Sequence, residues 1–283
     1  HEKSLGGTPG SVTQVRECAG ELQRLAKSKN IALLIVGHVT KEGMLAGPKV
    51  LEHLVDAVLT FEGDRYASHR ILRTVKNRFG ATNELGVFEM QSKGLVEVLN
   101  PSELFLSSDN APGISTIVAC EATRPIAIDI QALINQTSFP SPRRTATGIE
   151  SNRLHQILAV IEKHMNLALS RFDCYLAVAG GLEVEEPAAD LGIAAAIISS
   201  YKKNELPKGT IFIGEIGLGG QIRSVSQMQL RLREAERLGF NKAIIPKATG
   251  KDSHTKTNNK IEIIEVKNIS EAFEIALDIK SKQ

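Results

Sequence analysis

The sequence is poor in the residue types that mark several common protein classes. It has no Trp and only 4% aromatic residues, so aliphatic side chains must fill its cores. Its three cysteines, Cys18, Cys120 and Cys174, are an odd number and show no C-x-x-C spacing. This usage predicts a reducing cytoplasm and no zinc site within the chain. The longest apolar run, near residues 191–198, is too short to span a bilayer, so we expect no membrane association.

Two further absences concern the first residues and nucleotide binding. Residues 1–10 lack the apolar stretch of a signal peptide, and residue 1 is His rather than Met, so we expect a piece of a longer protein. No G-x-x-x-x-G-K-[ST] motif occurs, so we expect no nucleotide to be cradled by this chain. A net charge of +2, with 23% charged residues, excludes a broadly basic surface. Any DNA contacts must therefore come from local clusters of cations.

The hydrophobic periodicity predicts two domains that meet near residue 113. Residues 1–113 show a helix over 10–30 with an N-terminal capping box at Ser11 and Gln14, then a continuous apolar run at Ile31–Gly37. That run predicts a strand buried on both faces of a parallel sheet. A short helix and four closely spaced strands should follow, at residues 50–55, 57–61, 69–75, 85–90 and 95–98.

Residues 114–283 predict a second domain of the α+β type. Strands are expected at 114–120, 125–133, 175–179, 210–214, 243–246 and 261–266. Helices are expected at 152–164, 188–200, 228–238 and 270–279. The chain as a whole is thus predicted to combine α/β and α+β architecture, with no internal repeat.

The stretch KNRFG, from Lys76 to Gly80, places two cations and an aromatic ring on a turn between two predicted strands. Lys76 and Arg78 would share one face of an extended strand, with Asn77 and Phe79 on the other. Gly80 allows a tight turn. Such a pair of cations suits phosphate, either the γ-phosphate of ATP on a neighbouring subunit or the DNA backbone. The alternative is a solvated hairpin that Phe79 anchors.

A second group of candidates follows the predicted strand at Ile31–Gly37. His38 would lie at the carboxyl end of that strand, where open α/β sheets place ligands, so it is a candidate phosphate sensor. Lys41 and Lys49 lie in the loop after it and are candidate DNA contacts. A histidine hydrogen-bonded at a strand end and an ordinary surface loop are the competing interpretations.

Several long stretches resemble one family in the same order. PGSVTQVREC, VGHVTKEGMLAGPKVLEH, KNRFGATNELGVF, TRPIAIDIQAL, PRRTATGIESNR and EPAADL are similar to the RadA (Sms) family of bacterial DNA repair and recombination proteins. The resemblance implies that residues 1–113 form the C-terminal half of a RecA-like ATPase domain. It also implies that residues 114–283 form a Lon-protease-like domain of the ribosomal S5 domain 2 type. The Walker A loop and a four-cysteine zinc finger would precede the chain.

The resemblance also implies an activity and partners. It predicts a homo-hexameric, DNA-dependent ATPase and helicase that uses ATP and Mg²⁺ and promotes branch migration of recombination intermediates. Single-stranded DNA and a RecA-type recombinase are the implied partners, and KNRFG is the motif that couples ATP turnover to DNA. Without the nucleotide-binding loop, this piece should not hydrolyse ATP and should bind no cofactor by itself.

The Lon-like half raises the alternative of a peptidase. A Lon-type site resembles P-S-A-G, with a catalytic lysine some distance further along. The matching stretch here is Pro187-Ala188-Ala189-Asp190, and the lysine position falls on Gln229. The nucleophile and its base are therefore both replaced, which predicts that this domain does not cleave peptides. A non-catalytic, hexamer-forming scaffold is the third interpretation.

Arginines in PRRTATGIESNR are the remaining candidates for DNA contacts in this half. Arg143, Arg144 and Arg153 lie close together in the sequence and would line a ring channel with positive charge. The alternative is that they form structural salt bridges. Glu183 stands where the resemblance leads us to expect a lysine, so the basic lining should be thinner here.

Overall fold

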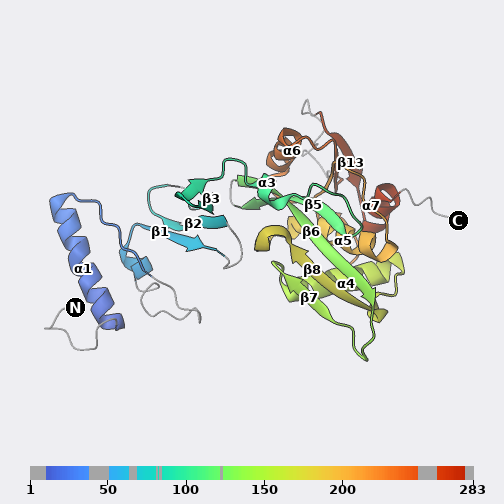
Figure 1. Ribbon diagram of the computed structural model, residues 1–283, viewed down its shortest axis with the longest axis horizontal. Helices are drawn as coiled ribbons and strands as arrows, with labels where there is room; N and C mark the ends of the chain where they lie inside the picture. Colours follow the sequence, from blue (N-terminus) through green and yellow to red (C-terminus); the bar gives the residue numbers. More distant parts are fainter. Residues whose placement is uncertain are drawn as a thin grey trace. The chain divides into compact units, whose positions relative to one another are not determined.

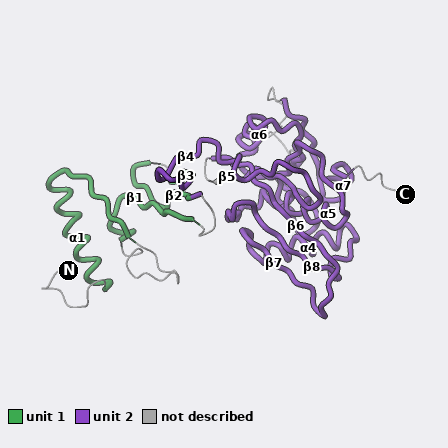
Figure 2. Tube along the Cα trace, viewed as in Figure 1, with its two compact units in different colours: residues 1–63, 70–88 green, residues 64–69, 89–283 purple. Residues whose placement is uncertain are grey.

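The chain divides into two compact units in the computed structural model, which describes residues 11–37, 51–63, 69–80, 82, 85–121, 124–247 and 260–277. Unit 1 comprises His1–Gly63 and Arg70–Phe88 (Figure 2). Unit 2 comprises Asp64–His69 and Glu89–Gln283. Together they make a mixed α/β fold whose described residues form a seven-stranded, a four-stranded and a two-stranded sheet, the last pairing β10, Glu215–Ile216, with β11, Ile222–Arg223.

Helix α1, Val12–Lys29, opens the described part of unit 1 and confirms the helix predicted for residues 10–30. Ser11 is its N-cap, and the Ser11 hydroxyl accepts a hydrogen bond from the Gln14 N–H at 3.5 Å. At the other end Asn30 adopts the left-handed conformation, with a φ of 54°, and closes the helix. The side chain predicted to start this helix therefore does so.

The prediction that Ile31–Gly37 forms a buried parallel strand is wrong. This segment has no regular structure, and Leu34 and Val36 are 84% and 78% exposed. A parallel strand needs neighbours to which its N–H and C=O groups can bond, and the described part of unit 1 offers none to this segment. The parallel sheet core expected in the first half is consequently not formed by the residues that the structure describes.

A small antiparallel sheet follows along the chain, with the order β1-β2-β3-β4. Residues 51–54 form a helical turn just before it. In the β1–β2 pair Ala57 lies opposite Asn77, and a bulge interrupts the register between Val58 and Leu59. The four strands were all predicted, and their bounds are β1 Ala57–Glu62, β2 His69–Asn77, β3 Leu85–Gln91 and β4 Gly94–Glu97.

Unit 2 is built on a seven-stranded mixed sheet with the order β13-β12-β9-β5-β6-β8-β7 (Figure 1). Strands β13, β12, β9 and β5 are parallel to one another, β6 is antiparallel to both β5 and β8, and β7 is parallel to β8. The strands are β5 Ile114–Glu121, β6 Arg124–Gln136, β7 Arg144–Thr147, β8 Phe172–Val178, β9 Thr210–Phe212, β12 Lys242–Pro246 and β13 Glu262–Val266.

Helices cover both faces of this sheet around β5. Ile117 and Val118 are neighbours on β5, so their side chains point to opposite faces. Ile117 lies against Gly192 of helix α5, Asp190–Lys202, whereas Val118 joins the apolar cluster that includes Leu232 of helix α6, Met228–Arg237. Helix α4, Ser151–Met165, packs on α5 and on α7, Ile269–Ala276. The predicted helices of this half are thereby confirmed.

A short helix and a glycine at positive φ lie beside the sheet. Phe105, the last residue of helix α3 (Ser102–Phe105), is 1% exposed and contacts the His69 ring edge-on, with ring centroids 5.4 Å apart. Gly180 has a φ of 70°, and a Cβ there would lie 2.5 Å from the Phe105 ring. Only glycine satisfies both the backbone conformation and this close approach.

Candidate functional site

The KNRFG motif begins at the end of β2 and continues into the turn that follows. The Lys76 ammonium donates hydrogen bonds to the carbonyls of Glu52, at 2.6 Å, and Val55, at 2.9 Å. These carbonyls lie at the end of the helical turn 51–54, where unpaired carbonyls and the helix dipole both favour a cation. Lys76 therefore fastens that turn to the end of the strand.

Arg78 and Phe79 are the exposed members of the motif. The Arg78 guanidinium lies 3.2 Å from a carboxylate oxygen of Asp56 and its side chain is 61% exposed, while Phe79 is 86% exposed. Beneath them the backbone is held, because the Arg78 N–H donates to the Asp56 carbonyl at 2.9 Å and the Phe79 N–H donates to Asn77 Oδ1 at 3.2 Å. An exposed ion pair contributes little stability, so a phosphate can displace Asp56 from the guanidinium.

The structure thus gives the two cations of the motif different surroundings. The Lys76 ammonium is engaged by backbone carbonyls, whereas the Arg78 guanidinium has one exposed partner. A Cβ at Gly80 would lie 2.8 Å from the Asn77 amide nitrogen, so glycine leaves room for the side chain that supports the turn. The other candidates of the first half, His38, Lys41 and Lys49, lie outside the described residues.

Ala188 and Gln229 stand where the resemblance places the serine and the lysine of a protease dyad. Ala188, 4% exposed, lies on the short 3-10 helix Pro187–Ala189, and it shares an apolar cluster with Met228, the neighbour of Gln229. Among the described residues, the Gln229 Oε1 atom is buried and has no hydrogen-bond partner. A methyl group and a carboxamide supply neither a nucleophile nor a general base, so dyad chemistry is not available here.

Two arginine–carboxylate pairs hold the segment that contains Ala188. On one side Arg231, 1% exposed, donates to both carboxylate oxygens of Glu186, at 2.7 and 2.5 Å, and to the Val118 carbonyl at 2.6 Å. Glu186 also accepts a hydrogen bond from the Cys120 N–H at 2.7 Å. This pair ties the segment to α6 and β5 together, and its polar atoms are well satisfied.

On the other side Asp190 pairs with Arg153 of α4. Both carboxylate oxygens of Asp190 accept from the guanidinium, one of them at 2.7 Å, and one also accepts from the Ile216 N–H at 2.9 Å. Asp190 is 1% exposed, and this burial raises the pKa of its carboxyl, an effect that the Arg153 hydrogen bond opposes. The hydrogen bond to Asp190 raises the pKa of the Arg153 guanidinium. Arg153 thus has the structural partner that one interpretation of the arginine cluster predicts.

Arg143 and Arg144 have opposite surroundings although they are neighbours in the chain. The Arg143 side chain is exposed, and its guanidinium carbon lies 3.6 Å from the centre of the Phe139 ring. Arg144 pairs in register with the buried Cys174. Burial raises the pKa of the Cys174 thiol to about 11, and the nearby charge of Arg144 opposes this. The structure therefore separates the three arginines into one exposed, one half-buried and one ion-paired residue.

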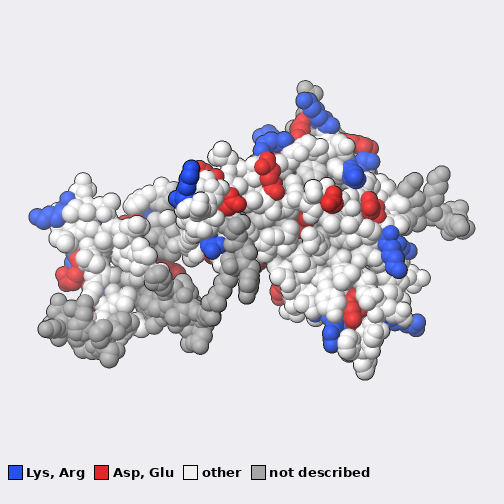
Figure 3. Space-filling view, in the orientation of Figure 1, with Lys and Arg blue, Asp and Glu red and all other residues white. Residues whose placement is uncertain are grey.

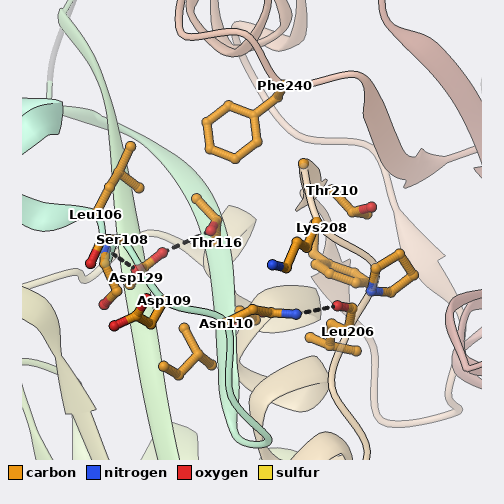
Figure 4. A pocket seen from close by; sticks show the side chains of 16 residues that line it. Leu106, Ser108, Asp109, Asn110, Thr116, Asp129, Leu206, Lys208, Thr210 and Phe240 are labelled. Atoms are coloured by element: carbon orange, nitrogen blue, oxygen red, sulfur yellow. Dashed lines mark hydrogen bonds between the residues drawn. The ribbon is translucent and has the colours of Figure 1, made fainter.

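A groove of about 230 Å³ lies at the amino ends of β5 and β9 (Figure 4). Its buried carboxylate, Asp129, accepts hydrogen bonds from the Ser107 N–H and the Thr116 hydroxyl, both at 2.7 Å, while the Lys208 ammonium extends into the hollow. Ala188, by contrast, accepts a hydrogen bond from Gly214, just beyond the carboxyl end of β9. The groove is thus separate from the dyad positions, at the other end of that strand.

The described residues do not form a zinc site of the kind that the resemblance assigns to the longer protein. Cys18, Cys120 and Cys174 lie on α1, β5 and β8, so they do not form a zinc finger. Among the described residues, no three His, Cys, Asp or Glu side chains come together as metal ligands. None of the described helices is long and apolar enough to cross a membrane. On the face shown in Figure 3, acidic and basic side chains are interspersed.

Comparison with known proteins assigns the chain to a class and then to a family. Residues 144–249 match a family described as subunit ChlI of Mg-chelatase, so this part of unit 2 is a ChlI-like α/β region. Over 97% of its length the chain is 57% identical to "DNA repair protein RadA" of Synechocystis, and over 98% it is 52% identical to the RadA of Bacillus subtilis. The chain belongs to the RadA family of DNA repair proteins. It spans 54% and 60% of the length of these two relatives.

Sequence reasoning missed three features of these sites. Strand β7 is not among the predicted strands, because its four residues, Arg144–Thr147, are too few to show a periodicity. Asp56 was not recognised as the partner of Arg78, and Glu186 was not recognised as the partner of Arg231. Both pairs join residues more than 20 positions apart, so only the arrangement of the strands brings them together.

Proposed function

We propose that this chain is the part of a RadA-type DNA repair ATPase that couples ATP turnover to DNA. In this proposal residues 1–113 complete a RecA-like ATPase domain, and residues 114–283 form a Lon-protease-like domain without proteolytic activity. The assembled protein is a homo-hexameric, ATP- and Mg²⁺-dependent helicase that promotes branch migration on single-stranded DNA beside a RecA-type recombinase. Family membership supports this proposal, but the chain covers little more than half of its relatives.

The observation that carries the proposal is the exposed guanidinium of Arg78 on a backbone that is held rigidly. Such a group reaches a phosphate bound by a neighbouring subunit without rearranging its own turn, and arginine fingers act in this way. Lys76 and Asn77 are positioning residues in this scheme, because they hold the helical turn and the Phe79 N–H. Phe79 offers its ring to DNA or to the adjacent subunit.

Mixing subunits in the full-length protein tests this assignment. Arg78→Ala should lower DNA-stimulated ATP hydrolysis by roughly 10³-fold or more, the range of arginine fingers. Arg73→Ala is the matched control, since Arg73 also lies on β2 and pairs with Glu62, and it should leave the rate near that of the unsubstituted protein. Subunits that cannot bind ATP but retain Arg78 should restore activity when mixed with Arg78→Ala subunits. No restoration would show that Arg78 acts on its own subunit or not at all.

The peptidase and scaffold alternatives make different predictions. A peptidase would cleave an unfolded protein substrate. The side chains of Ala188 and Gln229 cannot carry out this cleavage as a nucleophile and a base. A scaffold would assemble into a ring yet show no DNA-dependent ATP hydrolysis in the full-length protein. Light scattering together with the ATPase assay separates the scaffold from the proposed function.

A further inference from the structure

Strand β6 changes its burial pattern along its length, which shows that one face of the sheet becomes uncovered. From Ile126 to Ile130 every residue is buried, as expected for a strand covered on both sides. From Gln131 to Asn135 exposed residues alternate with buried or half-buried ones: Leu133 is 59% exposed whereas Ala132 is 8% exposed. Helices α5 and α6 therefore cover only part of the sheet, and beyond Ile130 one face is open.

The strand register identifies which side chains make up this open face. Leu133 lies opposite Tyr175 of β8, which lies opposite Thr145 of β7. The next row has the same arrangement, with Gln131, Ala177 and Thr147. Side chains directly opposite one another share a face. The open face is defined by Gln131, Leu133, Asn135, Thr145, Thr147, Tyr175 and Ala177.

The connection between β6 and β7, residues 137–143, joins the ends of these two strands (Figure 1) and carries an aromatic residue and a cation. Phe139 is 44% exposed and the Arg143 guanidinium lies over its ring. Two hydrogen bonds hold the connection: the Phe139 N–H donates to the Thr137 hydroxyl at 3.1 Å, and the Cys174 N–H donates to the Arg143 carbonyl at 2.8 Å. The ring and the cation thus have fixed places beside β8.

The charge at the Arg143 end of the open face suits a polyanion. The seven residues named above are uncharged, and Asp173, which lies opposite Asn135, is 6% exposed and accepts a hydrogen bond from the Arg143 N–H at 2.7 Å. Asp173 is thus withdrawn from solvent where the Arg143 side chain is exposed, whereas the exposed acids Glu183 and Glu185 flank Val184, which bonds to Gly148 beyond the other end of β7. The other groups are amides, hydroxyls, a phenol and a single leucine, which can bond to bases but form no continuous apolar patch of the kind that a second copy would bury.

We propose that the open face, with Phe139 and Arg143, binds single-stranded nucleic acid by base stacking and phosphate pairing. Phe139 stacks on one base, Tyr175 contacts the next, and Arg143 holds the intervening phosphate, in the way that sheet faces with aromatic residues bind single strands. The inference rests on the proposed DNA-binding function and gives it a surface and a mode. The proposed binding mode depends on Phe139, an uncharged residue that lies outside the arginine cluster of the sequence.

Binding of labelled oligo(dT) to the full-length protein, measured by fluorescence anisotropy, tests this inference. Phe139→Leu should weaken binding by about tenfold, while Phe139→Tyr, which keeps a ring, should retain it. Arg143→Gln should lower the slope of log affinity against log salt by about 1. Leu218→Ala is the matched control, because Leu218 is a 73% exposed apolar residue on the 217–220 turn. Oligo(dT) carrying 4-thiothymidine should crosslink at Phe139 or Tyr175.

Three results would overturn the inference. The first is binding by Phe139→Leu and Arg143→Gln that equals the binding of the unsubstituted protein, with no crosslink to β6–β8. The second is equal binding of duplex and single-stranded DNA by the unsubstituted protein. The third is variants that lose subunit assembly but keep DNA binding, which would make the face a contact between copies. Circular dichroism shows that each variant is folded. The subunit-mixing ATPase experiment on Arg78 does not involve this face, so its failure is distinguishable from these results.

Discussion

Replacing Arg153 with alanine should destabilise the fold far more than replacing an ordinary surface arginine. Asp190 is 1% exposed beside Arg153, and the substitution leaves the Ile216 N–H as its hydrogen-bond donor among the described contacts. Removing one partner of a buried ion pair costs about 3–5 kcal/mol. Because the Arg153 side chain is 28% exposed, water can partly replace it, and we expect the lower end, about 3 kcal/mol. This corresponds to roughly a hundredfold change in the unfolding equilibrium.

The cost should also depend on pH, with a sign that follows from the pKa of Asp190. Burial already raises this pKa, and Arg153 opposes the rise, so the substitution raises it further. The folded variant then binds a proton more tightly than the unfolded chain does. Stability of the variant, relative to the unsubstituted protein, should therefore recover as pH falls from neutrality through the raised pKa towards the ordinary range of an aspartate. An ion pair that is merely broken by acid would show the opposite trend.

Urea unfolding followed by circular dichroism, at neutral pH and near pH 5, measures both effects. Arg223→Ala is the control, since Arg223 forms an exposed pair with Glu215 at 3.5 Å and should cost less than about 1 kcal/mol at either pH. The reasoning is refuted if Arg153→Ala is as stable as Arg223→Ala. If it is stable yet no longer binds DNA, Arg153 is instead a DNA contact.

Two further predictions concern single residues of unit 2. Gly180→Ala forces a Cβ to within 2.5 Å of the Phe105 ring at a φ of 70°, so it should lower the unfolding midpoint in urea by an amount equivalent to more than about 1 kcal/mol; an unchanged midpoint would contradict the packing described. Cys174, with its pKa raised to about 11, should react with a thiol reagent at neutral pH at least about a hundredfold more slowly than an ordinary thiol. Mass spectrometry of labelled peptides should show Cys18 and Cys120, which are half-buried, modified before Cys174, and rapid labelling of Cys174 in the folded protein would contradict its burial.

Local signals were sufficient to predict most elements of the fold. The N-cap at Ser11 depends on a side chain three residues from its partner, and strands such as Ala57–Glu62 carry enough apolar residues to be recognised singly. The strand predicted at Ile31–Gly37 does not form, and the reason is physical. Its composition is that of a buried strand, but burial depends on partners that the sequence of the segment does not contain, and the described structure leaves it exposed.

The candidate sites were less predictable, because the role of an arginine depends on which carboxylate reaches it. Arg143, Arg144 and Arg153 form one cluster in the sequence and were considered as a group. In the structure their side chains diverge, since neighbours in an extended segment face opposite sides and Arg153 lies on a helix next to Asp190. The sequence does not reveal that Arg153 pairs with Asp190, because the two residues are 37 positions apart.

The arginines of this chain therefore divide by the geometry of their partners rather than by their position in motifs. Arg153 and Arg231 each use two nitrogens on a nearly buried pair, so binding a phosphate would strip a carboxylate of its counter-ion at a cost of several kcal/mol. Arg78 has one exposed carboxylate contact, and Arg143 has a ring beneath it, so either guanidinium can meet a phosphate at little cost. The segment around Ala188 follows the same logic, because its flanking carboxylates, Glu186 and Asp190, are both held by arginines. The two ion pairs therefore fix the backbone around Ala188 from both sides, and neither arginine is free to serve a ligand at this segment.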